Sequence, residues 1–239
     1  MGDVIGLLAF GSAGWSDELL AGAALTIALA LATLPFSLGL GLAIALLKRS
    51  DRRMIAGLGH AYTTVFRGLP ELLTLLMIYF GAPLAIQAAL KTIGLDARVE
   101  PSAFFSGVLA LSLVSAAFTS EVFLSAFNGI SRGQWEGAHA LGLNRRRTLG
   151  LVVLPQLVRL SLPGLSNSWL VLLKDTSLVS IIALEDLLRA TNLAVGATKQ
   201  PFLFYTTACC LYLLMTGASA LVLRRVEAHA ERPYVRSPA

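Results

Sequence analysis

The sequence is dominated by long apolar runs that contain few charges. The longest extends from Leu19 to Leu47 and has no Asp, Glu, Lys or Arg. A helix needs about 20 apolar residues to cross a bilayer, so this run is long enough to span a membrane even when tilted. Hydrophobic residues make up 56% of the chain and charged residues 14%, against about a quarter charged in soluble domains. This composition excludes a water-soluble globular domain.

Five such runs account for most of the 239 residues. No Pro-, Ser- or Gly-rich linker separates them, and no internal repeat is visible. The sequence therefore predicts a single all-α domain over residues 1–239, a polytopic membrane protein with five transmembrane helices and no room for a separate soluble catalytic domain. The predicted spans are residues 19–47, 62–86, 104–126, 162–183 and 202–223.

The distribution of basic residues predicts the orientation. With the N-terminus outside, the segments 48–61, 128–160 and 224–239 hold 4, 5 and 4 Lys and Arg, whereas 1–18, 87–103 and 184–201 hold 0, 2 and 2. Basic residues near the ends of spans are retained in the cytoplasm. We therefore expect the N-terminus outside and the C-terminus in the cytoplasm, and we do not expect a cleaved signal peptide.

The most informative segment is the basic loop of residues 128–160. Gln134 to Leu141 has the mixed apolar and polar pattern of a short surface helix. Gly142 is suited to a left-handed C-terminal cap of that helix. Pro155 marks the next discontinuity, because proline lacks the amide donor that a helix interior requires.

This loop resembles a motif of a known family. Glu136-Gly137-Ala138, then Gly142, then Val152, Leu154 and Pro155 match the spacing of the EAA loop of binding-protein-dependent ABC importer permeases, in which E-A-A is followed by G and then by I, any residue, L-P. Gly137 stands where the family usually has Ala. The arginine-glycine pattern common in amino-acid permeases is not kept at Leu124 and Ser125.

Three further segments resemble the polar amino-acid branch of that family, and the resemblance covers residues 20–228. It is strongest to the Q-type subunits of histidine, lysine, arginine and ornithine importers and to octopine and nopaline permeases. The segments are FRGLPELLTLLMIYFG (66–81), PGLSNSWLVLLKDTSLVSIIALEDLL (163–188) and RATNLAVGATKQPF (189–202).

The resemblance implies a type I ABC importer (MetI-like) permease in the bacterial inner membrane. It implies that the EAA helix docks on a cytoplasmic ATPase, present in two copies, which binds ATP and magnesium. It also implies a periplasmic amino-acid-binding protein, and a second permease of the M type or a second copy of this chain. The residues implied in ATPase coupling are Glu136, Gly137, Ala138, Gly142, Leu154 and Pro155.

The sequence agrees that energy comes from a partner, since it contains no G-x-x-x-x-G-K-[ST] phosphate loop. No catalytic residues are identified. His60, His139 and His229 are far apart and have no ligand spacing, so no metal site and no cofactor are expected in this chain. Its net charge of +5 is explained by its loops, and nucleic-acid binding is not expected.

Charged residues inside the predicted spans are the candidates for substrate contact, because ionisable groups at membrane depth usually face a cavity or a partner. Those candidates are Arg67, Glu71, Glu121 and Asp175. Arg67 and Glu71 are four apart, which predicts that they lie on one helix face. A net-negative polar interior suits a basic amino acid such as arginine, lysine, ornithine or histidine.

Structural roles compete with substrate contact at these positions. Arg67 is also suited to reach the lipid headgroups, Lys174 and Asp175 to join two spans, and Glu121 to act as a gate or interhelical hydrogen-bond residue. The wider alternatives are an opine or other polar amino-acid importer, a secondary transporter and a membrane-embedded enzyme. The absence of a repeat argues against the secondary transporter, and the absence of a convergent catalytic set argues against the enzyme.

Overall fold

The computed structural model describes residues 6–11, 14–95, 100 and 102–231, and every element in that part of the chain is helical. The elements are α2 (Ser16–Lys48), α3 (Arg53–Gly68), α4 (Glu71–Leu76), η1 (Met77–Gly81), α5 (Ala82–Thr92), α6 (Ala103–Gly129), α7 (Arg132–Ala140), α8 (Arg145–Thr148), η2 (Leu149–Val153), α9 (Leu154–Asp175), η3 (Thr176–Ile182), α10 (Leu187–Thr198) and α11 (Pro201–Glu231).

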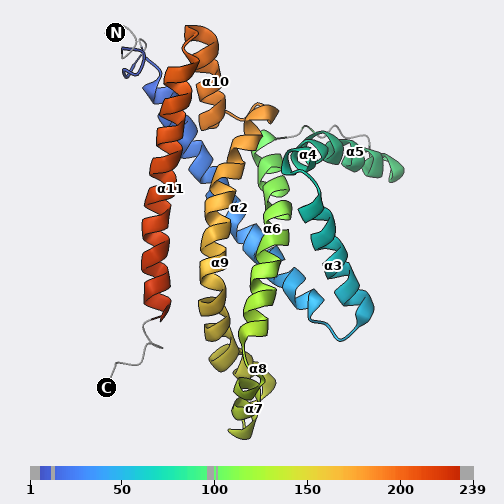
Figure 1. The fold of residues 1–239 in the computed structure, drawn as a ribbon. Helices are drawn as coiled ribbons and strands as arrows, with labels where there is room; N and C mark the ends of the chain where they lie inside the picture. Colours follow the sequence, from blue (N-terminus) through green and yellow to red (C-terminus); the bar gives the residue numbers. More distant parts are fainter. Residues whose placement is uncertain (1–5, 12–13, 96–99, 101, 232–239) are drawn as a thin grey trace, which may run out of the picture.

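Five helical runs are long and apolar enough to cross a membrane, which confirms the predicted number of spans. They are Ser16–Lys48, Glu71–Thr92, Ala103–Gly129, Arg145–Ile182 and Pro201–Ala230. Figure 1 shows α6 and α9 running along the middle of the bundle, with α7 and α8 at one end and α4, α5 and α10 at the other. We call these the α7 end and the α10 end. The first span begins at the α10 end and the last span finishes toward the α7 end.

The second predicted span, residues 62–86, is wrong in its boundaries. Helix α3 stops at Gly68, Leu69 is extended with φ −89° and ψ 141°, and a new helix begins at Glu71. The cause is Pro70, because the residue before a proline is sterically pushed out of the helical region. The apolar run that follows continues to Thr92. Arg67 and Glu71 therefore do not share a helix face, contrary to the prediction from their spacing.

The helical run that contains most of the fourth predicted span, residues 162–183, begins well before that span. Helical structure starts at Arg145 and continues through η2, a π-helical segment, into α9. Pro155 lies in the first turn of α9, directly after this π segment. Pro83 follows the other π segment, η1, in the same way. A π segment locally widens the helix, which accommodates a proline ring and its missing amide donor.

The centre of the bundle is the contact between α2 and α6, which is lined by small hydroxyl residues. The Ser37 hydroxyl donates to Ser115 Oγ at 2.7 Å, the Thr119 hydroxyl to the Ser37 carbonyl at 3.1 Å, and the Ser112 hydroxyl to the Thr33 carbonyl at 3.4 Å. Small polar residues let two membrane helices approach closely and bond to one another. The contact between α2 and α6 is therefore held by interhelical hydrogen bonds as well as by packing.

Helix α9 crosses α6 closely at a single glycine. A Cβ atom on Gly164 would lie 2.6 Å from Cγ1 of Val122. A larger residue at this position would require the Val122 side chain to move. Gly164 follows Pro163, which lies inside the helix. This tight contact between α6 and α9 thus lies near the middle of α9.

At the α10 end, Asp186, which lies just beyond the fourth predicted span, is fully buried. Its Oδ1 accepts a hydrogen bond from the backbone amide of Arg189 at 2.9 Å and thereby caps α10. Gly22 of α2 allows this junction to pack, because a Cβ there would lie 2.8 Å from the Asp186 carbonyl oxygen. Burial raises the pKa of Asp186 to about 6, and its hydrogen bonds to backbone amides oppose that shift.

Candidate translocation cavity and coupling helix

Two of the four predicted substrate-contact residues lie together. Glu71 and Asp175 line a cavity of about 260 Å³ between α4, α6 and α9. Glu71 is the first residue of α4, directly after the break at Pro70, and Asp175 is the last residue of α9. Both side chains are half-buried and the two carboxyl groups interact with each other. The start of α4 and the end of α9 therefore bring two acids to one site.

The remaining wall of this cavity is polar on α9 and mainly apolar on α6. Asn167 and Ser168 contribute an amide and a hydroxyl, and the α6 side contributes Ser115 with the apolar residues Leu111, Val114 and Phe118. Among the described residues that line the cavity there is no Lys or Arg. Lys174, next to Asp175 in the chain, is exposed and outside the lining. The cavity thus combines two carboxyl groups with hydrogen-bonding groups and an aromatic ring, and Lys174 acts on Asp175 only from outside the lining.

Arg67 and Glu121, the other two predicted contact residues, lie in a different place. Lys48 Nζ is 2.7 Å from Glu121 Oε1, and Arg67 Nη1 is 3.4 Å from the same oxygen. The Lys48 side chain is fully buried, whereas those of Glu121 and Arg67 are 36% and 47% exposed. The Arg67 guanidinium also lies 5.5 Å from the centre of the Phe118 ring. We call Lys48, Arg67 and Glu121 the ion cluster.

The ion cluster joins α2, α3 and α6, and Gly59 of α3 makes room for it. A Cβ atom on Gly59 would lie 2.8 Å from Cγ of Lys48. The sequence analysis did not predict a role for Lys48 inside the bundle, because Lys48 is the first of several basic residues in a loop. The available signal was that Lys48 directly continues the uncharged run that ends at Leu47. Asn167 and Ser168 were also missed, because polar residues in a span are usually interhelical contacts.

The predicted coupling helix is present as α7, Arg132–Ala140. Glu136 and Gly137 are exposed, whereas Ala138 is buried. Gly142 has φ +76°, and the Leu143 amide donates to the Ala138 carbonyl at 3.1 Å. This is the left-handed helix end predicted for Gly142, which glycine adopts without a steric penalty. Leu154 and Pro155 begin α9, where neighbouring Val153 is buried against Ala126 and Phe127 of α6.

No group of His, Cys, Asp and Glu side chains in the described part of the chain is arranged to hold a metal ion. The two cysteines, Cys209 and Cys210, are exposed on α11 and are not paired with each other. The site therefore consists of a cavity in the bundle and an exposed helix at the α7 end.

Comparison with known proteins identifies the family of this architecture. Residues 37–226 match the family model described as binding-protein-dependent transport system inner membrane component. The nopaline transport system permease protein of Agrobacterium fabrum is 37% identical over 95% of this chain and 96% of its own length. The arginine ABC transporter permease protein of Escherichia coli strain K12 is 37% identical over 90% of this chain and 95% of its own.

A solved structure agrees with these relatives. A chain from the crystal structure of an amino acid ABC transporter with histidines superposes with a TM-score of 0.75 at 29% identity, and the match covers 90% of this chain and 95% of that one. In this family ATP hydrolysis takes place in a separate subunit, and the permease works with a substrate-binding protein and a second permease. This chain belongs to the binding-protein-dependent ABC importer permeases and is an inner-membrane permease component of a polar amino-acid importer.

Proposed function

We propose that the chain forms half of the translocation pathway of an importer for basic amino acids. The observation that carries the proposal is the cavity in which Glu71 and Asp175 meet without a Lys or Arg in its described lining. A cationic side chain entering this cavity gains charge-assisted hydrogen bonds to the carboxylates, while Asn167 and Ser168 offer partners to the polar ends of an amino acid. Arg67 and Glu121 act through the ion cluster, which holds the helices around the cavity.

The proposed orientation places the α7 end in the cytoplasm and the start of the chain outside. It is supported by the excess of basic residues in segments 48–61, 128–160 and 224–239. In this orientation α7 faces cytoplasmic ATPase subunits, two copies of which bind ATP and magnesium. The pathway is completed by an M-type sister permease or a second copy of this chain. A reporter fused to the C-terminus tests this arrangement. We expect a reporter that folds only outside the cytoplasm to be inactive at this position.

The test of substrate class is uptake of radiolabelled arginine by the complete transporter in liposomes, with its ATPase, binding protein and second permease. Asp175→Asn and Glu71→Gln each remove one cavity charge. We expect each to lower arginine uptake about thirtyfold, since a charge-assisted hydrogen bond contributes about 2 kcal/mol. Glu185→Gln is the matched control, because Glu185 is exposed and does not line the cavity.

Uptake by both variants at the rate of the control would refute the role of the cavity carboxylates. Unlabelled nopaline is added as a competitor to test the opine alternative, which the 37% identical nopaline permease suggests. Competition stronger than that of unlabelled arginine would assign the transporter to opines.

Coupling to the ATPase is tested with two glycines of the EAA loop. Gly142→Asp is expected to abolish transport while membrane insertion is kept, because Gly142 has φ +76° and any side chain there is strained. Gly137→Ala is the control, since a Cβ at Gly137 meets nothing within 4 Å. The measurements are uptake and the stimulation of ATP hydrolysis by the loaded binding protein. Normal uptake by Gly142→Asp would exclude the coupling role of this loop.

A further inference from the structure

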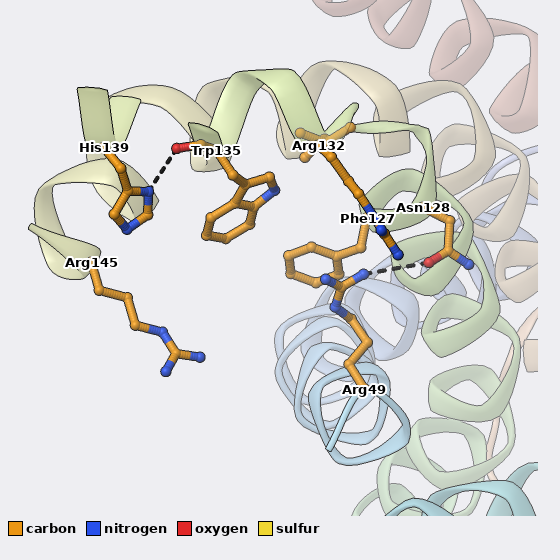
Figure 2. Close-up of a pocket in the computed structure, with 8 residues that line it drawn as sticks. Arg49, Phe127, Asn128, Arg132, Trp135, His139 and Arg145 are labelled. Carbon is orange, nitrogen blue, oxygen red and sulfur yellow. Dashed lines mark hydrogen bonds between the residues drawn. The ribbon is translucent and has the colours of Figure 1, made fainter. Parts of the chain in front are cut away.

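A second cavity lies at the α7 end, outside the translocation pathway, and it is strongly basic. It measures about 550 Å³ and lies where the ends of α2 and α6 meet α7 and α8. Its cationic lining comes from three different segments, namely Arg49, Arg132 and Arg145, and His139 lies beside them (Figure 2). No Asp or Glu lines it within the described part of the chain. Three arginines around one cavity without a carboxylate indicate an anionic ligand.

The arginine nearest the membrane is held in position before any ligand arrives. The Arg49 guanidinium lies 4.8 Å from the centre of the Phe127 ring and donates to Asn128 Oδ1 at 3.4 Å. Figure 2 shows Arg49 between the Phe127 ring and Asn128, with the Trp135 ring facing Phe127 across the cavity. A stacked guanidinium loses little conformational freedom when it binds an anion.

The other cationic groups are available to a ligand. The side chains of Arg132 and Arg145 have no hydrogen bond or ion pair with any residue that the structure describes. His139 Nδ1 lies 2.6 Å from the Trp135 carbonyl oxygen, and because a carbonyl only accepts, this nitrogen carries the proton. The Trp135 carbonyl oxygen thus occupies Nδ1 of His139, and the cationic groups available to an anion are Arg132 and Arg145.

The position of the cavity indicates that the anion belongs to a lipid. Arg49 directly follows the apolar span that ends at Lys48, so the cavity lies at the height where a span meets the headgroups. A neighbouring hollow of about 390 Å³ shares Arg49, Phe127, Trp135 and Arg145 and continues to Leu46 and Leu149. Leu46 is 52% exposed and Leu149 39% exposed. The hollow also contains Asp51, which lies outside the basic cavity itself.

We propose that this basic cavity binds the phosphate of an anionic phospholipid, with the acyl chain lying along Leu46 and Leu149. A basic cavity that opens onto exposed apolar side chains matches a molecule with a phosphate at one end and a hydrocarbon chain at the other. A soluble phosphate ion would contact the basic cavity but not the exposed apolar side chains. The bound lipid would connect the end of the first span with the coupling helix, since Arg49 belongs to one and Arg132 begins the other.

The test is native mass spectrometry of the intact chain and of its assembled transporter, both extracted in mild detergent and exposed to phosphatidylglycerol or phosphatidylcholine. We expect phosphatidylglycerol to remain bound to both preparations and phosphatidylcholine to be lost. The double variant Arg49→Gln and Arg132→Gln is expected to bind phosphatidylglycerol about 25-fold more weakly, because each cation near a membrane surface contributes about fivefold. Arg132→Gln alone serves if the double variant does not fold.

The matched control is Arg224→Gln with Arg225→Gln, which removes the same charge from exposed residues of α11 toward the same end of the bundle. Equal lipid loss in this control would reduce the effect to general surface charge and overturn the proposal. Displacement of the lipid by millimolar inorganic phosphate would assign the cavity to a soluble anion. Lipid bound by the isolated chain but absent from the assembled transporter would assign the cavity to the ATPase contact.

Discussion

The ion cluster and the translocation cavity place acidic side chains among the same membrane helices in opposite electrostatic settings. In the ion cluster, Glu121 lies within 4 Å of two cations, Lys48 and Arg67. In the cavity, Glu71 and Asp175 lie beside each other, and their described surroundings contain no cation among the lining residues. Glu121 is thus neutralised by cations of the protein itself, whereas the two cavity acids have no Lys or Arg among the residues that line the cavity. A charged residue in a span thus reveals its role through its neighbours rather than through its depth.

The largest change in stability is expected when the anion is removed from the ion cluster. Glu121→Gln leaves the buried Lys48 ammonium without its counterion, and we expect it to destabilise the protein by about 3 kcal/mol. Thermal unfolding in detergent measures the change. The double variant Lys48→Met with Glu121→Leu should recover most of the loss, because no charge then remains buried. If the double variant unfolds as early as the single one, the pair is not what stabilises this region.

A second test disturbs the packing over the ion cluster without altering any charge. Gly59→Ala introduces a methyl group 2.8 Å from Cγ of Lys48 and is expected to destabilise the protein by about 2 kcal/mol. Gly57 lies on the same helix and a Cβ there meets nothing within 4 Å. Gly57→Ala should therefore be neutral or slightly stabilising. The same thermal measurement compares the two variants, and equal melting temperatures would contradict the close contact.

A third test uses Asp186, a buried carboxyl group near the α10 end. Burial raises its pKa from 3.8 to about 6, so the folded state binds its proton more readily than the unfolded state does. Stability should therefore rise as the pH falls from 7 to 5, by about 1.3 kcal/mol at 1.36 kcal/mol per unit, and this gain is lost as the pH rises through 6. Asp186→Asn keeps the cap oxygen and should lack this pH dependence. Identical pH profiles for the two proteins would show that Asp186 does not titrate in this range.

The smallest effect is expected in the cavity itself and has the opposite sign. Asp175→Asn removes a carboxylate that lies beside Glu71 and has no cationic neighbour in the described cavity lining. We expect the variant to be more stable than the natural protein by about 1 kcal/mol, the scale of repulsion between two partly solvated like charges. Differential scanning fluorimetry without substrate measures this gain. A loss of stability would mean that Asp175 is a structural acid like Glu121.

The sequence could predict what depends on local pattern. The five apolar runs, the short helix of the EAA loop and the left-handed conformation of Gly142 follow from hydropathy and from glycine geometry. Pro70 indicates a helix break after Gly68. Hydropathy averaged over the apolar run that begins at Tyr62 does not detect the effect of one proline. Local pattern therefore found the spans and misplaced the boundaries of the second span.

The partners of the charged residues could not be predicted, because they come from distant parts of the chain. Lys48 and Glu121 are joined only when α2 packs on α6, and Asp186 is buried only because α10 packs against α2 near Gly22. Glu71 and Asp175 meet because two helices happen to begin and end at one cavity. Each of these contacts depends on helix packing, which apolar periodicity does not specify.

The tight contact of Gly164 with Val122 lies near the middle of α9. Leu154 lies ten residues before Gly164 and Asp175 eleven residues after it, so the two segments are about 15 and 17 Å long at 1.5 Å per residue. If α9 tilted by about 10° around Gly164, its two ends would move by about 3 Å in opposite directions. A displacement beside the EAA loop would then reach the acid of the cavity at nearly full size and with its direction reversed.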